Sequence, residues 1–349
     1  MRTDQLRELL HADGPFVSVY VDASHDTEDA TTRNELRWRA AETELAEQGA
    51  DQATISATGA AVLDPPAVGR AGRAVIAAGG EVLLTEDLPV PPATDLTRWS
   101  ELPFLLPLLA SAAPPVAHVV VLADKVDGEL RAVDANGETV QTESAHGSTE
   151  DRTTETVRRN AKDVAGQAVH LVEQVDAELL VLAGTVQART AIQSELPAHV
   201  RELVVELDVN ATHTGLDDPQ VRGGVARLLA QILAERDESA LERLRVGRAH
   251  GNACEGLAEV TEALRSGAVE AVLVTDPTLG GRSVWRGADP TQLATRPEQF
   301  GEQLVERRAD EAVPVAALET SADVLVLTGA ATVSDGVGAL LRFSPPAQV

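Results

Sequence analysis

Cysteine and aromatic residues are nearly absent from this sequence of 349 residues, which has one cysteine, Cys254, and only 2% aromatic side chains. A single thiol forms no internal disulfide and leaves too few ligands for a structural zinc site. Long apolar runs are also missing, since none reaches the length of about 18 residues that a transmembrane helix needs. The charged stretch before Gly14 lacks the apolar core of a signal peptide. We therefore expect a cytoplasmic protein without a membrane segment.

Basic residues are scarce as well. The chain has 29 lysines and arginines against 55 acidic residues, a formal net charge of -26, and its only lysines are Lys125 and Lys162. An acidic surface repels nucleic acid at long range, so we expect no DNA binding and no attachment to anionic membranes. A local RNA contact is still compatible with this charge, because salt screens charges over about 8 Å at physiological ionic strength.

The motifs of the main cofactor-dependent and hydrolytic enzyme classes do not occur. There is no phosphate-binding loop, dinucleotide fingerprint, zinc-protease helix or serine nucleophile elbow. None of the eight histidines has another histidine four residues away, so we expect no metal, no cofactor and no catalytic residue. Asp22, His25, Asp26 and Asp29 could serve acid/base or metal chemistry, but a polar turn before the next helix is the interpretation we favour.

What the sequence does contain is a pattern typical of α/β domains. Apolar residues make up 44% of the chain and suit layers packed from aliphatic side chains. The pattern predicts three domains, over 1–112, 113–215 and 216–349. In the first we expect a short N-terminal amphipathic helix, a helix over 28–48, a second helix after it and three strands. The strands are 16–22, 73–78 and 81–86, and the last two are joined by a turn at 79–80. Seven prolines within 88–115 predict an irregular boundary segment.

The second domain is predicted to open with a three-stranded meander over 117–126, 129–135 and 138–143. From Thr153 onward the apolar spacing becomes helical, with a stripe made of Val157, Ala161, Val164, Ala168, Leu171 and Val175. A buried strand over 178–184, a short helix over 186–196 and a second buried strand over 202–208 complete the domain.

The third domain begins with a helical connector over 218–246. Asn252 and Glu255 have the spacing of a helix-capping pair, and Gly267 is a stop signal. After that helix we expect a strand over 268–276, a loop over 277–297 and a helix over 300–309. Three further strands are predicted to follow, over 313–318, 323–329 and 339–343.

Four stretches resemble the archaeal and eukaryotic class-1 release factor and Pelota superfamily. They are GPFVSVYVDASHDTEDA (14–30), TTETVRRNAKDVAGQAVHLVEQ (153–174), GLAEVTEALRSGAVEAVLV (256–274), and RADEAVPVAAL (308–318) with DGVGALLRF (335–343). The order of elements is most similar to the bacterial branch, with its mycobacterial release-factor-like proteins and Balon-like hibernation factors.

The resemblance implies a ribonuclease H-like middle domain and a C-terminal α/β/α sandwich like that of kink-turn-binding ribosomal proteins. It also implies binding at the ribosomal A site, with ribosomal RNA as the surface and elongation factor Tu as a further candidate partner. Release factors of the superfamily carry Gly-Gly-Gln before the long middle-domain helix, whereas the corresponding loop here reads SAHGSTEDRTT (144–154). We therefore expect no peptide release, and a factor that occupies idle or stalled ribosomes in hibernation, rescue or a stress response.

Candidate RNA contacts lie in two regions. Arg158, Arg159 and Lys162 face away from the apolar stripe near a helix start, where positive charge opposes the helix dipole unless an outside anion is present. Pairing of Glu155 with Arg158 and Arg159 is the alternative. The preceding loop adds His146, Gly147 and Arg152. In the third domain, loops are expected to present further candidates to phosphate or a base: Arg248, His250, Arg282, Trp285 and Arg286. The alternative is that the tryptophan lies at the edge of the core and the arginines are solvated.

Two other functions stay open on the sequence alone. One is a ribosome-rescue enzyme that cleaves peptidyl-tRNA with His146 as general base. The other is an interaction module that binds a translation factor and no RNA.

Overall fold

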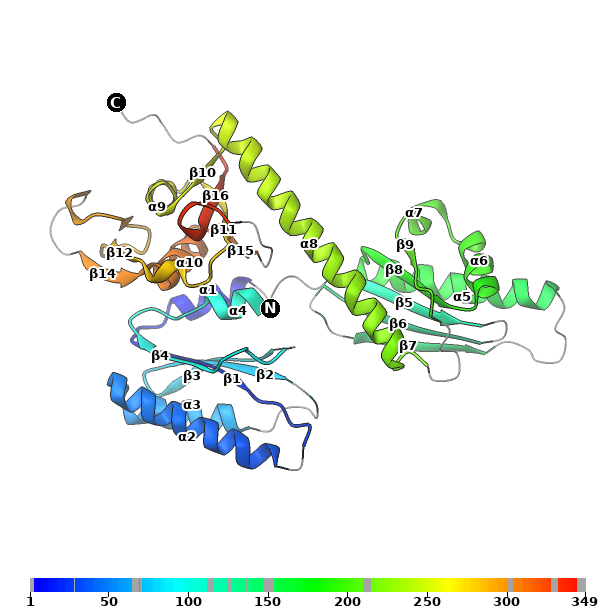
Figure 1. The fold of residues 1–349 in the computed structure, drawn as a ribbon, viewed down its shortest axis with the longest axis horizontal. Helices are drawn as coiled ribbons and strands as arrows, with labels where there is room; N and C mark the ends of the chain where they lie inside the picture. The colour runs from blue at the N-terminus through cyan, green and yellow to red at the C-terminus, as the bar shows by residue number, and fades with distance from the viewer. Residues whose placement is uncertain are drawn as a thin grey trace. The chain divides into compact units, whose positions relative to one another are not determined.

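A computed structural model describes residues 3–27, 29–64, 69, 71–88, 90–111, 116–124, 127–135, 137, 139–146, 154–209, 215–299, 304–327 and 332–343. The chain forms two compact units. The first combines Met1–Ala113 with Asp237–Val349, and the second is Pro114–Arg236. Each unit is built from helices packed on β-sheets, which confirms the α/β class (Figure 1). The division into three domains stays a prediction.

The N-terminal part of the first unit is a four-stranded antiparallel sheet in the order β3-β2-β1-β4. Its strands are β1 (Phe16–Asp22), β2 (Gly72–Ala78), β3 (Glu81–Leu88) and β4 (Leu96–Ser100). Alternate residues of β1 such as Val17 and Val19 pack against two helices, α2 (Ala30–Gln48) and α3 (Gln52–Leu63). The predicted turn at Gly79–Gly80 is confirmed, and both residues have the positive φ that such hairpin turns require.

The proline-rich segment 88–115 is more regular than predicted. It contributes β4 to the sheet and a short helix, α4 (Leu106–Ser111). Proline does not interrupt β4, and Pro107 lies in the first turn of α4, where a missing N–H is tolerated. Leu105, Leu106 and Leu108 are fully buried in an apolar cluster shared with the C-terminal part of the unit. Leu105 and α4 therefore belong to the core of the first unit.

The C-terminal part of the first unit contains two sheets, in the orders β10-β16-β11-β15 and β13-β12-β14. Its elements are β10 (Ala253–Glu255), α9 (Leu257–Arg265), β11 (Val269–Val274), β12 (Ser283–Arg286), β13 (Leu293–Ala294), β14 (Val305–Arg308), α10 (Ala309–Glu319), β15 (Asp323–Val326), β16 (Val337–Leu341) and the short η1 (Leu279–Gly281), η2 (Pro297–Gln299) and η3 (Ser334–Gly336). The N-terminal helix α1 (Thr3–Leu10) contributes Leu6 and Leu9 to the same apolar cluster.

Several element predictions for this part were wrong. The expected strand 313–318 is the interior of α10, and the expected helix 300–309 includes the strand β14. Asn252 caps no helix, because β10 follows it and α9 begins after Gly256. The expected loop 277–297 contains β12 and β13. The strand 268–276 and the stop at Gly267 are confirmed by β11 and by the end of α9.

The second unit is a five-stranded sheet in the order β7-β6-β5-β8-β9. Its elements are β5 (His118–Ala123), β6 (Asp127–Val133), β7 (Thr139–His146), α5 (Thr154–Val175), β8 (Leu179–Gly184), α6 (Val186–Glu195), α7 (Ala198–Arg201), β9 (Val204–Glu206) and the long α8 (Pro219–His250), whose residues fall to both units. The predicted meander is confirmed by the antiparallel pairs β5–β6 and β6–β7. One face of the sheet packs against α5 and α6, and the other against the N-terminal part of α8.

Candidate nucleic-acid interface

The outward face of α5 carries three cations that we call the α5 surface: Arg158, Arg159 and Lys162. All three are exposed. The predicted stripe lies on the other side of the helix, and Ala161, Val164, Ala168, Leu171 and Val175 are all buried. The packing of this stripe against β5 and β6 holds the cations toward solvent, as the sequence predicted.

The three cations differ in their partners. Arg158 Nε lies 3.2 Å from Glu195 Oε1 in α6, although the arginine side chain is 75% exposed. Arg159 and Lys162 form no ion pair with any residue that the structure describes. The side chain of Glu155 lies outside the described residues, so its pairing with these arginines stays a prediction. The helix dipole acts mainly within the first turn, and α5 begins at Thr154, so the dipole acts only weakly on Arg159 and Lys162. The lack of an ion-pair partner among the described residues is therefore a stronger sign of an external anion than the position of these cations near the helix start.

The loop before α5 is not tested by the structure. The backbone of His146 ends β7, but its side chain lies outside the described residues, as do Gly147 and Arg152. Their contact with RNA stays a prediction.

Two of the predicted arginines in the first unit are neutralised by carboxylates. Arg248 lies in the last turn of α8, as does His250, so the loop prediction was wrong for both. The guanidinium of Arg248 pairs with Glu255, a carboxylate that also accepts a hydrogen bond from the Ser334 backbone. That backbone hydrogen bond, with the Arg248 charge, holds the pKa of Glu255 below its usual value despite partial burial. Arg248 is therefore part of an internal network.

Arg282 is tied to the same region. Its Nη2 lies 3.1 Å from Asp335 Oδ1, and its Nη1 donates to the Leu279 carbonyl at 3.0 Å. Asp335 also accepts a hydrogen bond from the Leu257 backbone N–H at the start of α9, at 3.1 Å. The network thus fixes the turn at 334–336 against α9, which gives Arg282 a structural role whether or not it meets RNA.

Trp285 and Arg286 lie on β12 and not on a loop, so that prediction was wrong too. Both are half-buried, and Arg286 Nε is a buried donor that no described residue accepts. Burial and the neighbouring Arg307 charge lower the pKa of Arg286. Arg307 lies on the adjacent strand β14, directly opposite Val284 of β12. Alternate residues of a strand share a face, so Arg286 lies on the same face as Val284 and Arg307, whereas Trp285 points to the opposite face. We call Arg286 and Arg307 the β12 surface; an anion there would satisfy a donor whose burial costs about 1–3 kcal/mol.

Sequence reasoning missed Arg307. The signal was the pair Arg307–Arg308 beside a glutamate, but without the strand pairing nothing related it to Arg286, 21 positions earlier in the sequence. Its neighbour Arg308 is engaged by Asp310 at 2.7 Å. Of these two arginines, only Arg307 forms no ion pair with a described residue.

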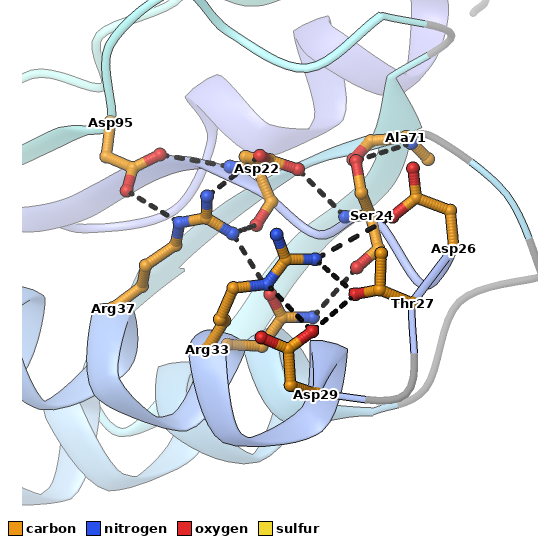
Figure 2. A network of polar contacts seen from close by, with 10 residues as sticks. Asp22, Ser24, Asp26, Thr27, Asp29, Arg33, Arg37, Ala71 and Asp95 are labelled. Atoms are coloured by element: carbon orange, nitrogen blue, oxygen red, sulfur yellow. Dashed lines mark hydrogen bonds and ion pairs between the residues drawn. The ribbon is translucent and has the colours of Figure 1, made fainter.

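The acidic turn after β1 is an ion-pair network, shown in Figure 2. Arg37 binds Asp22 at 2.9 Å and Asp95 at 3.6 Å. Arg33 reaches Asp26 at 3.7 Å and Asp29 at 3.9 Å. Each of the four carboxylates thus lies within ion-pair distance of one of two guanidinium groups, so none of the four is an isolated base.

The hydrogen bonds of this turn fit the polar-turn interpretation. Partial burial raises the pKa of Asp22, but hydrogen bonds from Ser24 and the charge of Arg37 bring it below its usual value. His25 forms a backbone bridge to Gly69, and no described residue hydrogen-bonds its buried Nδ1. Among the described residues no group of three His, Cys, Asp or Glu side chains could hold a metal. Over the same residues no helix is long and apolar enough to cross a bilayer.

Comparison with known proteins places this chain among release-factor-like sequences. The family described as bacterial archaeo-eukaryotic release factor family 2 matches residues 117–250, from β5 to the end of α8. The Mycobacterium tuberculosis protein named "Uncharacterized protein Rv2629" is 34% identical over 369 residues, covering 99% of this chain and 97% of the relative.

Two solved structures match this chain over most of its length. A model of ribosome-bound archaeal Pelota and ABCE1 matches with 18% identity and a TM-score of 0.43, over 98% of this chain and 94% of the matched chain. The crystal structure of Archaeoglobus fulgidus Pelota matches with 16% identity and a TM-score of 0.40, over 99% of this chain and 94% of that chain.

Proposed function

Because this chain belongs to the bacterial archaeo-eukaryotic release factor family, we propose that it is a ribosome-associated translation factor that occupies the A site of idle or stalled ribosomes. It acts by occlusion, in hibernation or rescue, and does not cleave peptidyl-tRNA. Elongation factor Tu is the protein partner that we include in the proposal. The sequence supports the non-enzymatic part, since Gly-Gly-Gln occurs nowhere in it.

The α5 surface is the observation that carries this proposal. Its cations lie within the segment that matches the family. Arg159 and Lys162 are exposed without an ion pair among the described residues, in a chain whose net charge is -26. An acidic protein approaching RNA is repelled at long range, so a contact needs a local group of cations. Phosphate oxygens of ribosomal RNA supply the opposite charge, and each contact releases counterions.

The β12 surface is proposed as a second contact. Arg286 and Arg307 offer donors to phosphate, and Trp285, on the opposite face of β12, offers a separate ring on which an unpaired base can stack. The orphaned Nε of Arg286 supports this assignment. Arg248 and Arg282 are weaker candidates, because Glu255 and Asp335 already neutralise them.

Co-sedimentation with ribosomes over a salt series tests the α5 surface. The variant Arg159→Glu with Lys162→Glu reverses two charges there, and Arg222→Glu with Arg227→Glu makes the same change in net charge on α8. If the α5 cations meet phosphate, the first variant binds more weakly and its slope of log affinity against log salt falls by about 0.7–0.9 for each lost contact. The α8 variant should bind as the wild type does. Equal binding by both variants would remove the α5 surface from the proposal.

A peptide-release assay separates the proposed role from the enzymatic alternative. The purified protein should release no peptide from stalled ribosomes above background. Release that disappears in His146→Ala would establish hydrolysis with that histidine as the base and overturn the proposal. Binding of elongation factor Tu without any ribosome binding would favour the interaction-module alternative.

A further inference from the structure

The second unit has a cavity of about 280 Å³ between its sheet and the start of α8. The strand register shows which residues line the cavity on the side of the sheet. Across β5 and β6, His118 lies opposite Val133 and Val120 lies opposite Arg131, while Val133 lies opposite Thr139 of β7. Residues that lie opposite each other on antiparallel strands share one face of the sheet. This face therefore presents two valines beside a histidine and an arginine.

The roof of the cavity comes from α8 and the turn before it. Leu216, Val221, Val225 and Leu229 line it, and they belong to the apolar layer that covers this face of the sheet. Arg222 and Ala226 line it from the exposed side of the helix. The result is an apolar cavity with cationic groups beside it.

His118 contributes a hydrogen-bond acceptor. Its side chain is 8% exposed, and Nδ1 lies 2.6 Å from the Val116 carbonyl oxygen. A carbonyl can only accept, so Nδ1 carries the hydrogen and Nε2 has the lone pair. Burial lowers the pKa of His118, although the Val116 hydrogen bond opposes this, so the ring is neutral at physiological pH. No described residue hydrogen-bonds Nε2.

The two arginines supply positive charge. Arg131 Nη2 lies 3.1 Å from Asp217 Oδ1, but that aspartate side chain is 76% exposed. Exposed ion pairs contribute little, so another carboxylate can replace this one at small cost. Arg222 forms no ion pair with a described residue. The charge beside the cavity therefore favours an anion.

We propose that this cavity binds a small amphipathic carboxylic acid, with its apolar body against Val120, Val133 and Val225 and its carboxylate at Arg222 and Arg131. The volume of about 280 Å³ lies just below the range for ligand sites, about 300–1,000 Å³, which limits the ligand to a small molecule. An apolar body matches the valines, and arginine binds carboxylates through paired donors. A hydroxyl on the ligand finds an acceptor in His118 Nε2. The site is independent of the α5 surface and of ribosome binding.

Calorimetric titration of the full-length protein with sodium octanoate tests the proposal. Octylamine carries the same apolar chain with the opposite charge, and acetate carries the same carboxylate without the chain. Octanoate should bind one to one, while octylamine and acetate give no saturable heat.

Matched variants locate the site. Arg222→Gln should weaken octanoate binding by about tenfold, the effect of losing one charged hydrogen bond, and Arg227→Gln on the same helix should leave it unchanged. Ala226→Trp fills the cavity from an exposed helical position and should abolish binding, whereas Ala230→Trp, exposed one turn later, should not. Thermal melts followed by circular dichroism check that each variant folds.

Three results would overturn the proposal. Octanoate that gives no saturable heat shows that the cavity does not take this ligand class. Equal binding of octylamine shows that the arginines select no anion. Octanoate binding that survives both Arg222→Gln and Ala226→Trp shows that the ligand binds elsewhere.

Discussion

Arg98 is the nearest cation to the buried Glu311 and also contacts the buried Asp310, and its removal should strongly destabilise the first unit. Its Nη1 lies 2.9 Å from Glu311 Oε1 and 3.4 Å from Asp310 Oδ1, and each acidic side chain is only 2% exposed. The arginine comes from β4 and the acids from the start of α10, so the contact joins the N-terminal and C-terminal parts of the unit. The other cation, Arg308, reaches Asp310 at 2.7 Å but Glu311 only at 4.0 Å.

The size of the effect follows from this geometry. Arg98→Met leaves Glu311 without its nearest cation, and breaking a buried ion pair costs about 3–5 kcal/mol. The Arg98 guanidinium also lies 3.5 Å from the centroid of the Phe104 ring, a contact that contributes about 0.5–2 kcal/mol. Protonation of Glu311 limits the loss. We therefore expect the free energy of unfolding to fall by about 3 kcal/mol at neutral pH.

The sign of the pH dependence is defined by Glu311. Burial raises its pKa, although the Arg98 charge opposes this. A carboxyl group with a raised folded-state pKa contributes stability below its unfolded pKa, and that contribution is lost as pH rises through the folded value. Removing Arg98 raises the folded value further. The deficit of Arg98→Met should therefore be smallest near the ordinary glutamate pKa of about 4.3 and grow toward neutral pH.

Urea unfolding followed by tryptophan fluorescence measures this deficit. The three tryptophans, Trp38, Trp99 and Trp285, all belong to the first unit, so the signal reports that unit alone. The double variant Arg98→Met with Glu311→Gln should recover part of the loss, because glutamine carries no charge. A deficit below about 1 kcal/mol at neutral pH, the range of an exposed ion pair, or one that does not change with pH, would refute the reasoning.

Two further predictions concern the N-terminal sheet and use the same unfolding assay. Asp51→Ala removes the cap of α3, in which Asp51 accepts hydrogen bonds from the Thr54 backbone at 2.9 Å and its hydroxyl at 2.7 Å, and should lower stability by about 1 kcal/mol. These Thr54 hydrogen bonds also lower the pKa of Asp51, so the difference from wild type should be present above the unfolded pKa and shrink as pH falls through the folded one. Gly59→Ala places a methyl group 2.6 Å from the Trp38 ring, and overpacking of this kind should cost about 1–3 kcal/mol and shift the folded-state emission spectrum.

The fold was predictable from the sequence where two local signals agreed. The strand 16–22 alternates and ends in turn residues, and the helix from Thr153 shows a continuous stripe, so both were predicted within a few residues. Prediction failed for 313–318, because all ten residues from Ala309 to Leu318 in α10 are buried. A helix that is buried on every side has no polar face to show its period, and a short apolar run then looks like a strand.

The candidate site was predictable only in part, because ion-pair partners are set by the tertiary fold. The structure pairs Arg158 with Glu195, which is 37 positions away in the sequence. Arg282 and its partner Asp335 are 53 positions apart. No spacing rule relates such pairs, since the strands and turns that bring them together are themselves long-range features.

Because acidic residues outnumber basic ones in this chain, a basic side chain without an ion-pair partner is informative. With 55 acidic residues against 29 basic ones, carboxylates are plentiful near most arginines, and Arg33, Arg37, Arg73, Arg189, Arg248 and Arg282 each lie within ion-pair distance of one. Exposed pairs form at little cost, so pairing is the expected state of a cation here. Among the described residues, the cations that depart from it include Arg159 and Lys162 on α5, Arg222 on α8, and Arg286 with Arg307 on β12 and β14. Under the proposed function, the acidity of the chain repels nucleic acid in general, and the local positive surfaces select where RNA makes contact.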